Sequence, residues 1–233
     1  TPTTPLKLSV DIGDVRIDRT VSIDDQYLFT LTDTLTNTGS REANVQRKGI
    51  AREVNLPEGL TNFFIIQEGP ISVVDGTYHE QKYKKLRKKG GWNNTGEGGW
   101  VGLTDKYWLI SSIAPQGKMI TASYDFRQIN DQDVYETSYT LDTLTLTPGA
   151  SVTSVGHMMA APKERNMLRA YEDAGITDMT NAIGWGKMKV LVKPISSALT
   201  WLGHKLGNFG FGILALTLII KILMFPLYNK QYA

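Results

Sequence analysis

The chain has 233 residues, of which 41% are hydrophobic and 21% charged, with a formal net charge of +2. This composition is ordinary for a globular protein with one large or two small domains, and the small net charge predicts no nucleic-acid partner. Because there is no cysteine, disulfides and thiolate metal sites are excluded. The chain begins with neither an initiator Met nor a signal pattern and ends just after an apolar segment, so we expect a fragment of a longer protein.

Residues 1–160 are predicted to form an antiparallel β-sandwich. Between residues 6 and 37, apolar and polar residues alternate and threonine is frequent, as is typical of half-buried strands. Turn residues then separate further short strands at intervals of about ten residues, which favours a sandwich. These strands are expected at 63–67, 71–74, 100–103, 107–113, 119–126, 134–141 and 143–146.

A basic run, KYKKLRKK, occupies residues 82–89 and precedes the glycine-rich GGWNNTGEGGW. The run has two interpretations: a site for anionic lipid head groups or an acidic partner, and a solvated loop, which we favour. The three tryptophans of this region, Trp92, Trp100 and Trp108, suit either a stacking platform or packing in the core and turns. We favour packing.

Residues 161–182 are predicted to be a connecting helix and linker. Pro162 suits the first helical position, and Gly175 is expected to end the helix. The apolar residues at helical spacing between them are Met167, Leu168 and Tyr171.

Residues 183–206 are predicted to form an amphipathic helix, kinked or restarted at Pro194. Its apolar positions are Met188, Leu191, Val192, Ile195, Leu199, Leu202 and Leu206, and Lys189, Lys193, Ser196 and Thr200 share the opposite face. Together with these lysines, Trp185 and Trp201 favour a helix in the membrane interface. The alternative is a helix packed on a soluble core, which the apolar segment that follows makes less favoured.

Residues 207–228 are predicted to be a transmembrane helix, because roughly 20 apolar residues give about 30 Å of helix, the thickness of the hydrocarbon core. Lys221 interrupts this segment. A charge at that depth costs roughly 2.5–3.5 kcal/mol on insertion scales. Tyr228 lies about 11 Å of helix rise beyond Lys221, too far for full snorkelling, so a wet polar cavity lined by other helices is the favoured interpretation.

Motifs for enzymatic chemistry are weak. The sequence has 3 histidines, none at metal-ligand spacing, and neither a nucleophile elbow nor a nucleotide-binding fingerprint. The adjacent His79 and Glu80 would point to opposite faces of a strand. We therefore predict no enzyme, no metal site and no cofactor.

Three segments resemble one family. The sequence NFGFGILALTLIIKILMFPLYNKQY, residues 208–232, resembles the start of the conserved core of the YidC/Oxa/Alb family of membrane protein insertases. Upstream, GWGKMKVLVKP at 184–194 is similar to the family's interfacial helix, with Lys187 and Lys189 where aromatic residues are usual. GGWVGLTDKYW at 98–108 and EGPI at 68–71 resemble the large periplasmic domain of Gram-negative members.

The resemblance implies a supersandwich-like periplasmic domain, akin to sugar-binding and mutarotase folds and without known catalysis. Residues 207–228 would be the second transmembrane helix of a multi-pass inner-membrane protein, and 229–233 the start of a cytoplasmic segment. Lys221 would replace the usual Arg in a hydrophilic substrate groove, as a point charge without the bidentate fork. Thr217, one turn earlier, would share that face.

The implied function is insertion and folding of nascent inner-membrane proteins, alone or with the Sec translocon and its accessory subunits, in contact with the phospholipid bilayer. Compared with the family, the chain lacks the first transmembrane segment, about half of the β domain and the later core helices. The sandwich is therefore expected to be incomplete, with unpaired strand edges.

Two alternatives remain. One is a membrane-anchored carbohydrate-binding β-sandwich, in which Lys221 would be dispensable. The other is a mutarotase-like enzyme, which requires an acid/base pair in a cleft, supplied by His157 or by His79 and Glu80.

Overall fold

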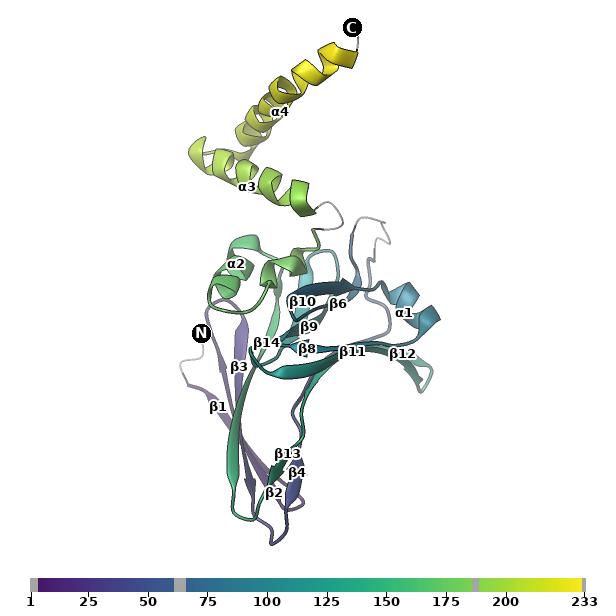
Figure 1. The fold of residues 1–233 in the computed structure, drawn as a ribbon, viewed down its shortest axis with the longest axis vertical. Helices are drawn as coiled ribbons and strands as arrows, with labels where there is room; N and C mark the ends of the chain where they lie inside the picture. Colours follow the sequence, from purple (N-terminus) through teal and green to yellow (C-terminus); the bar gives the residue numbers. More distant parts are fainter. Residues whose placement is uncertain (1–3, 61–65, 186–188, 232–233) are drawn as a thin grey trace. The chain divides into compact units, whose positions relative to one another are not determined.

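The computed structural model describes residues 4–60, 66–185 and 189–231 and divides into two compact units (Figure 1). Residues Thr1–Gly184 form the first, called the β unit, and Trp185–Ala233 form the second, called the helical unit. The described part of the β unit is mainly antiparallel sheet, so the predicted antiparallel sandwich is confirmed.

Two sheets face each other in the β unit, and a small ribbon extends from them. The 8-stranded sheet has, in spatial order, β1 (Leu6–Ile12), β2 (Val15–Ile23), β3 (Leu28–Asn37), β14 (Ser151–Pro162), β10 (Trp108–Ile113), β9 (Gly99–Thr104), β6 (Gly69–Val74) and β7 (Thr77–Glu80). The 4-stranded sheet has β5 (Lys48–Val54), β12 (Gln132–Leu141), β11 (Met119–Ile129) and β8 (Trp92–Glu97). The ribbon pairs β13 (Leu144–Leu146) with β4 (Ala43–Val45).

The strands expected from residue 71 onward are found as β6, β9, β10, β11, β12 and β13, whereas β4, β5, β7, β8 and β14 were not predicted. The stretch from 6 to 37 divides into three strands, with Gly13 in the left-handed conformation (φ 58) at the first turn. The strand expected at 63–67 begins in residues 61–65, which lie outside the described residues. Every residue of the edge strand β1 is exposed, as expected for an incomplete sandwich.

The basic run is helical, so its interpretation as a solvated loop is wrong. Helix α1 (Tyr83–Lys89) buries Tyr83 and Leu86, which lie three residues apart and therefore on one face, at 4% and 0% exposure. The glycine-rich stretch after it forms β8 and the start of β9.

The packing interpretation of the tryptophans holds for two of the three. Trp100 is fully buried, and the Trp92 ring stacks on Tyr124 with centroids 4.5 Å apart. Trp108 is 57% exposed. A turn position alone does not decide whether a side chain is covered.

Helix α2 (Arg165–Asp173) and the 3₁₀ helix η1 (Met179–Ile183) follow the last strand. The prediction that Pro162 begins the helix is wrong, because Pro162 ends β14 and pairs with Trp108. The helix is instead capped by Glu164, whose carboxylate accepts hydrogen bonds from the backbone N–H groups of Asn166 and Met167. The apolar residues of α2 and η1 pack on the 8-stranded sheet in one core cluster with Trp100.

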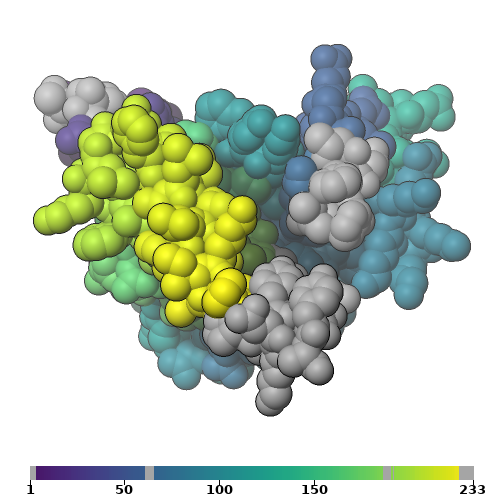
Figure 2. All heavy atoms as spheres, turned by 90° about the horizontal axis from the view of Figure 1, so that it is seen from above, coloured from purple at the N-terminus to yellow at the C-terminus, as the bar shows by residue number. Residues whose placement is uncertain are grey.

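Helices α3 (Lys189–Lys205) and α4 (Phe209–Gln231) form the helical unit, and both are visible from above in Figure 2. A kink or a restart was predicted at Pro194. Helix α3 continues through Pro194, so the restart is wrong, and the kink stays a prediction. The two helices approach closely at glycines, where a Cβ on Gly212 would lie 3.0 Å from the backbone nitrogen of Gly203. Among the described residues, no helix combines the length and hydropathy needed to cross a membrane. The span at 207–228 stays a prediction.

A buried carboxylate provides a stability test for the β unit. Glu136 on β12 has a side chain 1% exposed and forms ion pairs with Lys48, Arg52 and Arg127 at 3.3, 2.6 and 2.8 Å. Burial raises the pKa of this carboxyl, but hydrogen bonds from Arg52 and Lys48 and the charge of Arg127 outweigh that effect, so its pKa is lowered overall. Its stabilisation is therefore present above the unfolded pKa, about 4.3, and is lost as pH falls below it.

Glu136→Gln is expected to lower the free energy of unfolding by about 2 kcal/mol at pH 7, less than for a fully buried pair because the cations are half-exposed and screened. The difference from wild type should shrink as the pH falls from 7 to 3, because the carboxyl of the unfolded chain takes up a proton before the native one does. Urea unfolding at both pH values measures this. The control Asp11→Asn breaks an exposed pair with Arg16 and should change little. An equal deficit at both pH values would assign the effect to packing.

Candidate functional site

Apolar side chains cover the described part of α4 and remain exposed within the helical unit. The residues that are at least 40% exposed are Phe209, Phe211, Ile213, Leu214, Leu218, Ile219, Ile220, Ile222, Leu223, Met224 and Phe225. A helix that is apolar on all sides is normally buried in a protein core or a membrane. Such a continuous exposed apolar surface therefore marks a segment that another phase or partner covers.

Lys221 lies within this apolar surface. Its side chain is exposed, and no ion pair among the described residues includes it. Thr217 lies one turn before it, so the two side chains share a face of α4. The Thr217 hydroxyl donates a hydrogen bond of 2.7 Å to the carbonyl of Ile213, which leaves the lone pairs of its oxygen for another donor. The structure thus brings the two predicted groove residues together on α4, while the groove itself stays a prediction.

The predicted interfacial residues lie at the start and along the length of α3. The Lys193 ammonium is 5.8 Å from the ring centroid of Trp185, within cation–π range, and Trp201 is 63% exposed. The side chain of Lys189 lies outside the described residues. On the apolar face, Val192 and Ile195 remain 38% and 37% exposed, so the helical unit does not cover this face completely.

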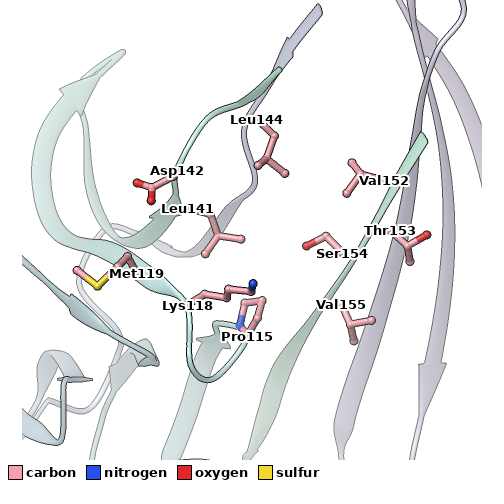
Figure 3. Close-up of a pocket in the computed structure, with 10 residues that line it drawn as sticks. All are labelled: Pro115, Lys118, Met119, Leu141, Asp142, Leu144, Val152, Thr153, Ser154 and Val155. Carbon is pink, nitrogen blue, oxygen red and sulfur yellow. The ribbon is translucent and has the colours of Figure 1, made fainter. Parts of the chain in front are cut away.

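A cavity of about 450 Å³ opens in the β unit between the end of β12, the ribbon strand β13 and β14 (Figure 3). Leu141 and Leu144 face Ser154 across it, and Pro115 and Lys118 lie at its base (Figure 3). Its lining residues are Pro115, Lys118, Met119, Leu141, Asp142, Leu144, Val152, Thr153, Ser154 and Val155. None of these ten is aromatic, and His157, His79 and Glu80, the residues named for the enzyme alternative, are not among them.

The candidate histidines do not converge. His157 on β14 and His79 on β7 are separated by three strands of the same sheet, about 19 Å at the usual spacing. Burial lowers the pKa of both imidazoles, and Arg47 lowers that of His157 further, so both are neutral near pH 7. His157 is hydrogen-bonded to the Thr30 hydroxyl, at 3.1 Å. Among the described residues, no group of three or more His, Asp or Glu side chains is placed to hold a metal ion.

A second polar centre was missed by sequence reasoning. Asp33 on β3 is 4% exposed and receives two hydrogen bonds from Arg19, at 2.6 and 2.9 Å, and an ion pair with Arg47 at 3.0 Å. Arg47 also donates to the carbonyl of Ser154. Arg19 on β2 and Arg47 balance the charge of this carboxylate, and the bond from Arg47 to Ser154 links it to β14, so Asp33 connects three strands. Asp33 lies on the same strand face as apolar residues, but no local signal identifies its partners.

Comparison with known proteins places these features in context. The family model described as "YidC periplasmic domain" matches residues 1–198. Relatives named "Membrane protein insertase YidC" include that of Maricaulis maris, 37% identical over 235 residues and covering 100% of this chain and 40% of the relative. That of Methylorubrum extorquens is 35% identical and covers 99% of this chain and 39% of the relative. The chain thus spans about two fifths of the length of the relatives it matches.

The solved structures that resemble this chain are less similar to it than the relatives named above. Slr1438 from Synechocystis gives a TM-score of 0.41 at 9% identity, covering 67% of this chain and 61% of that one. A galactose mutarotase related enzyme from Lactobacillus acidophilus gives 0.41 at 10% identity, covering 66% of each chain. Scores this low support no argument about function.

Proposed function

The chain belongs to the YidC periplasmic domain family, and on that premise we propose that the full protein is an insertase that assists insertion and folding of inner-membrane proteins. The observation that carries the proposal is the single cation, Lys221, within the otherwise apolar described surface of α4. In this proposal the predicted span at residues 207–228 crosses the inner membrane, and the β unit lies in the periplasm.

Lys221 acts as a transient attraction for acidic or polar parts of a client. At 4 Å and an effective dielectric of about 20, the attraction between unit charges is about 4 kcal/mol. Placing an acidic residue at the centre of a membrane helix costs about 2.5–3.5 kcal/mol. The two magnitudes are comparable, so one cation in a wet groove offsets most of the cost. Transfer of the client's own apolar helix then completes insertion without a nucleotide.

Thr217 has a supporting role on the same face. Its hydroxyl oxygen accepts hydrogen bonds from water or a client amide while its proton is bound to the Ile213 carbonyl. Together, the Thr217 hydroxyl and the Lys221 ammonium keep water near the charge, which lowers the free-energy cost of that charge in the bilayer. The remaining walls of the groove come from parts of the full protein beyond this chain.

The β unit serves as a docking surface on the periplasmic side for accessory subunits of the Sec translocon. The support is its family membership.

Reconstitution tests the proposal. The full-length protein is placed in vesicles of phosphatidylethanolamine and phosphatidylglycerol, and a single-span client with one acidic residue in its translocated tail is added without nucleotide. We expect the tail to become protected from external protease, and empty vesicles to give little protection. Equal protection with and without the protein would contradict the insertase function.

A further inference from the structure

The turn between β9 and β10 carries exposed aromatic side chains on a rigid backbone. Residues 105–108 form this turn, in which the Asp105 backbone N–H donates to the Trp108 carbonyl at 3.2 Å. The Asp105 carboxylate accepts from the backbone N–H groups of Tyr107 and Trp108, at 2.9 and 2.8 Å. Since both aromatic residues are held through their backbone, contact with a partner would cost little ordering of the turn.

A second element fixes the turn from outside. The Lys163 ammonium donates to the Asp105 carbonyl at 2.7 Å, and the Lys163 backbone N–H donates to the Tyr107 carbonyl at 2.8 Å. Burial lowers the pKa of Lys163, whereas the charge of Asp105 raises it. Lys163 therefore belongs to the scaffold of the turn, and the groups free to contact a partner are those at its tip.

The tip combines two aromatic rings with a cation. Tyr107 is 62% exposed and Trp108 57% exposed, and the Lys106 ammonium lies 4.8 Å from the centroid of the Tyr107 ring. Tyr and Trp beside a long cationic side chain are typical of residues at the head-group level of a bilayer, because each has an apolar body and a polar end.

The tip lies at the end of the β unit from which the chain continues. Thr104, just before the turn, pairs with Gly69, and a Cβ on Gly184, the last residue of the unit, would lie 3.7 Å from the Cβ of Gln67. Figure 1 shows the labels α2, β10 and β6 toward one end of the β unit and the β4–β13 ribbon at the other. The aromatic tip is thus at the end that leads into the helical unit.

Unpaired cations begin at the same end. A Cβ on Gly69 would lie 2.8 Å from the backbone nitrogen of Tyr83, which places the first turn of α1 beside the strand end. Four lysines of α1 are exposed and take part in no ion pair among the described residues: Lys84, Lys85, Lys88 and Lys89. Clustered lysines near a membrane surface attract anionic lipids.

We propose that the β9–β10 turn of the β unit, through Lys106, Tyr107 and Trp108, is a lipid-binding site that places its aromatic pair in the interfacial region of an anionic phospholipid bilayer. The α1 lysines supply electrostatic attraction to the same surface. The inference rests on the proposed membrane location of the full protein but goes beyond it, because it assigns the bilayer as a partner of the β unit itself. Aromatic burial gives the contact its depth, and the lysines make it dependent on anionic lipid.

A spin label at the tip tests this site. This chain has 0 cysteines, and any cysteine elsewhere in the full-length protein is replaced by serine, so that Lys106→Cys places one nitroxide beside the aromatic pair. The substitution removes the cation of the tip, so the label reports the immersion that Tyr107 and Trp108 produce without it. In nanodiscs of phosphatidylethanolamine and phosphatidylglycerol, we expect collisions with oxygen to rise and collisions with a water-soluble nickel chelate to fall at least 2-fold relative to detergent. A label at the exposed Ser40, which follows the C-terminal end of β3, should show no such change.

Two further variants test whether the aromatic pair causes the immersion of the label. Tyr107→Ser with Trp108→Ser should return the label to water, whereas Ile12→Ser, which removes an apolar side chain of matched exposure (63%), should not. Replacing phosphatidylglycerol by phosphatidylcholine should reduce immersion, and no reduction would remove the α1 lysines from the proposal. A label that stays in water while the protein remains in the nanodisc overturns the site and leaves the turn for a protein partner. Because the protein is still in the nanodisc, this result contradicts the lipid-binding site but not the proposed membrane location.

Discussion

Lys221→Ala in the full-length protein is expected to reduce insertion of clients with acidic tails at least 10-fold, at an unchanged protein level. The alanine removes the attraction that offsets the cost of the client's carboxylate, and a loss of only about 1.4 kcal/mol already corresponds to 10-fold. Lys221→Arg keeps the charge and is expected to retain insertion. The measurement is protease protection of the client tail in a strain depleted of the native insertase.

Two comparisons isolate the groove charge. Lys205→Ala removes an exposed cation at the end of α3 and should leave insertion unchanged. A client with a neutral tail should depend much less on Lys221 than an acidic one. If Lys221→Ala inserts every client as well as wild type, Lys221 is a snorkelling lysine and the proposed mechanism is wrong, even though the family membership stands.

Period-two alternation predicted most strands because it depends on each residue and its near neighbours alone. Residues 100–103 and 119–126 fall within β9 and β11 for that reason. The helix α1 was missed because its buried residues, Tyr83 and Leu86, are only two apolar positions within a run of cations. Two apolar positions are too few to establish a helical period.

The sequence alone did not reveal contacts between residues that are far apart in the chain. Arg52 and Glu136 are 84 residues apart, and their contact exists only because β5 and β12 pair. Strand ends show the same limit, since Pro162 suits a helix start locally but is held at the end of β14 by pairing with β10. The pair Thr217 and Lys221 was predictable because helical spacing alone places both on one face.

Exposure of the aromatic residues also depends on tertiary contacts. The sequence GGWVGLTDKYW contains a fully buried tryptophan, Trp100, and a largely exposed one, Trp108, within nine positions. Strand alternation alone does not separate them, because an even spacing of eight places both on the same side of a regular strand, and the turn between them resets the face. The buried ring is structural, and the exposed one is available for a partner.

Trp100→Ala is expected to lower the free energy of unfolding of the β unit by about 3–5 kcal/mol. The ring is fully buried in the cluster that holds α2 and η1 on the 8-stranded sheet, and its indole N–H donates to the Thr177 carbonyl at 3.1 Å. The substitution opens a cavity and removes the hydrogen bond to the Thr177 carbonyl. Urea unfolding followed by far-UV circular dichroism measures the loss.

Trp100→Phe separates the two contributions, because it keeps most of the ring volume and removes the hydrogen bond. It should cost about 1–3 kcal/mol, clearly less than alanine. Ile12→Ala, at a side chain 63% exposed, should change stability by no more than about 0.5 kcal/mol. If Trp100→Ala were as mild as Ile12→Ala, the packing of α2 and η1 on the sheet would not hold this end of the β unit together. The rigid support inferred for the β9–β10 turn, which depends on Lys163 just before α2, would then lose its basis.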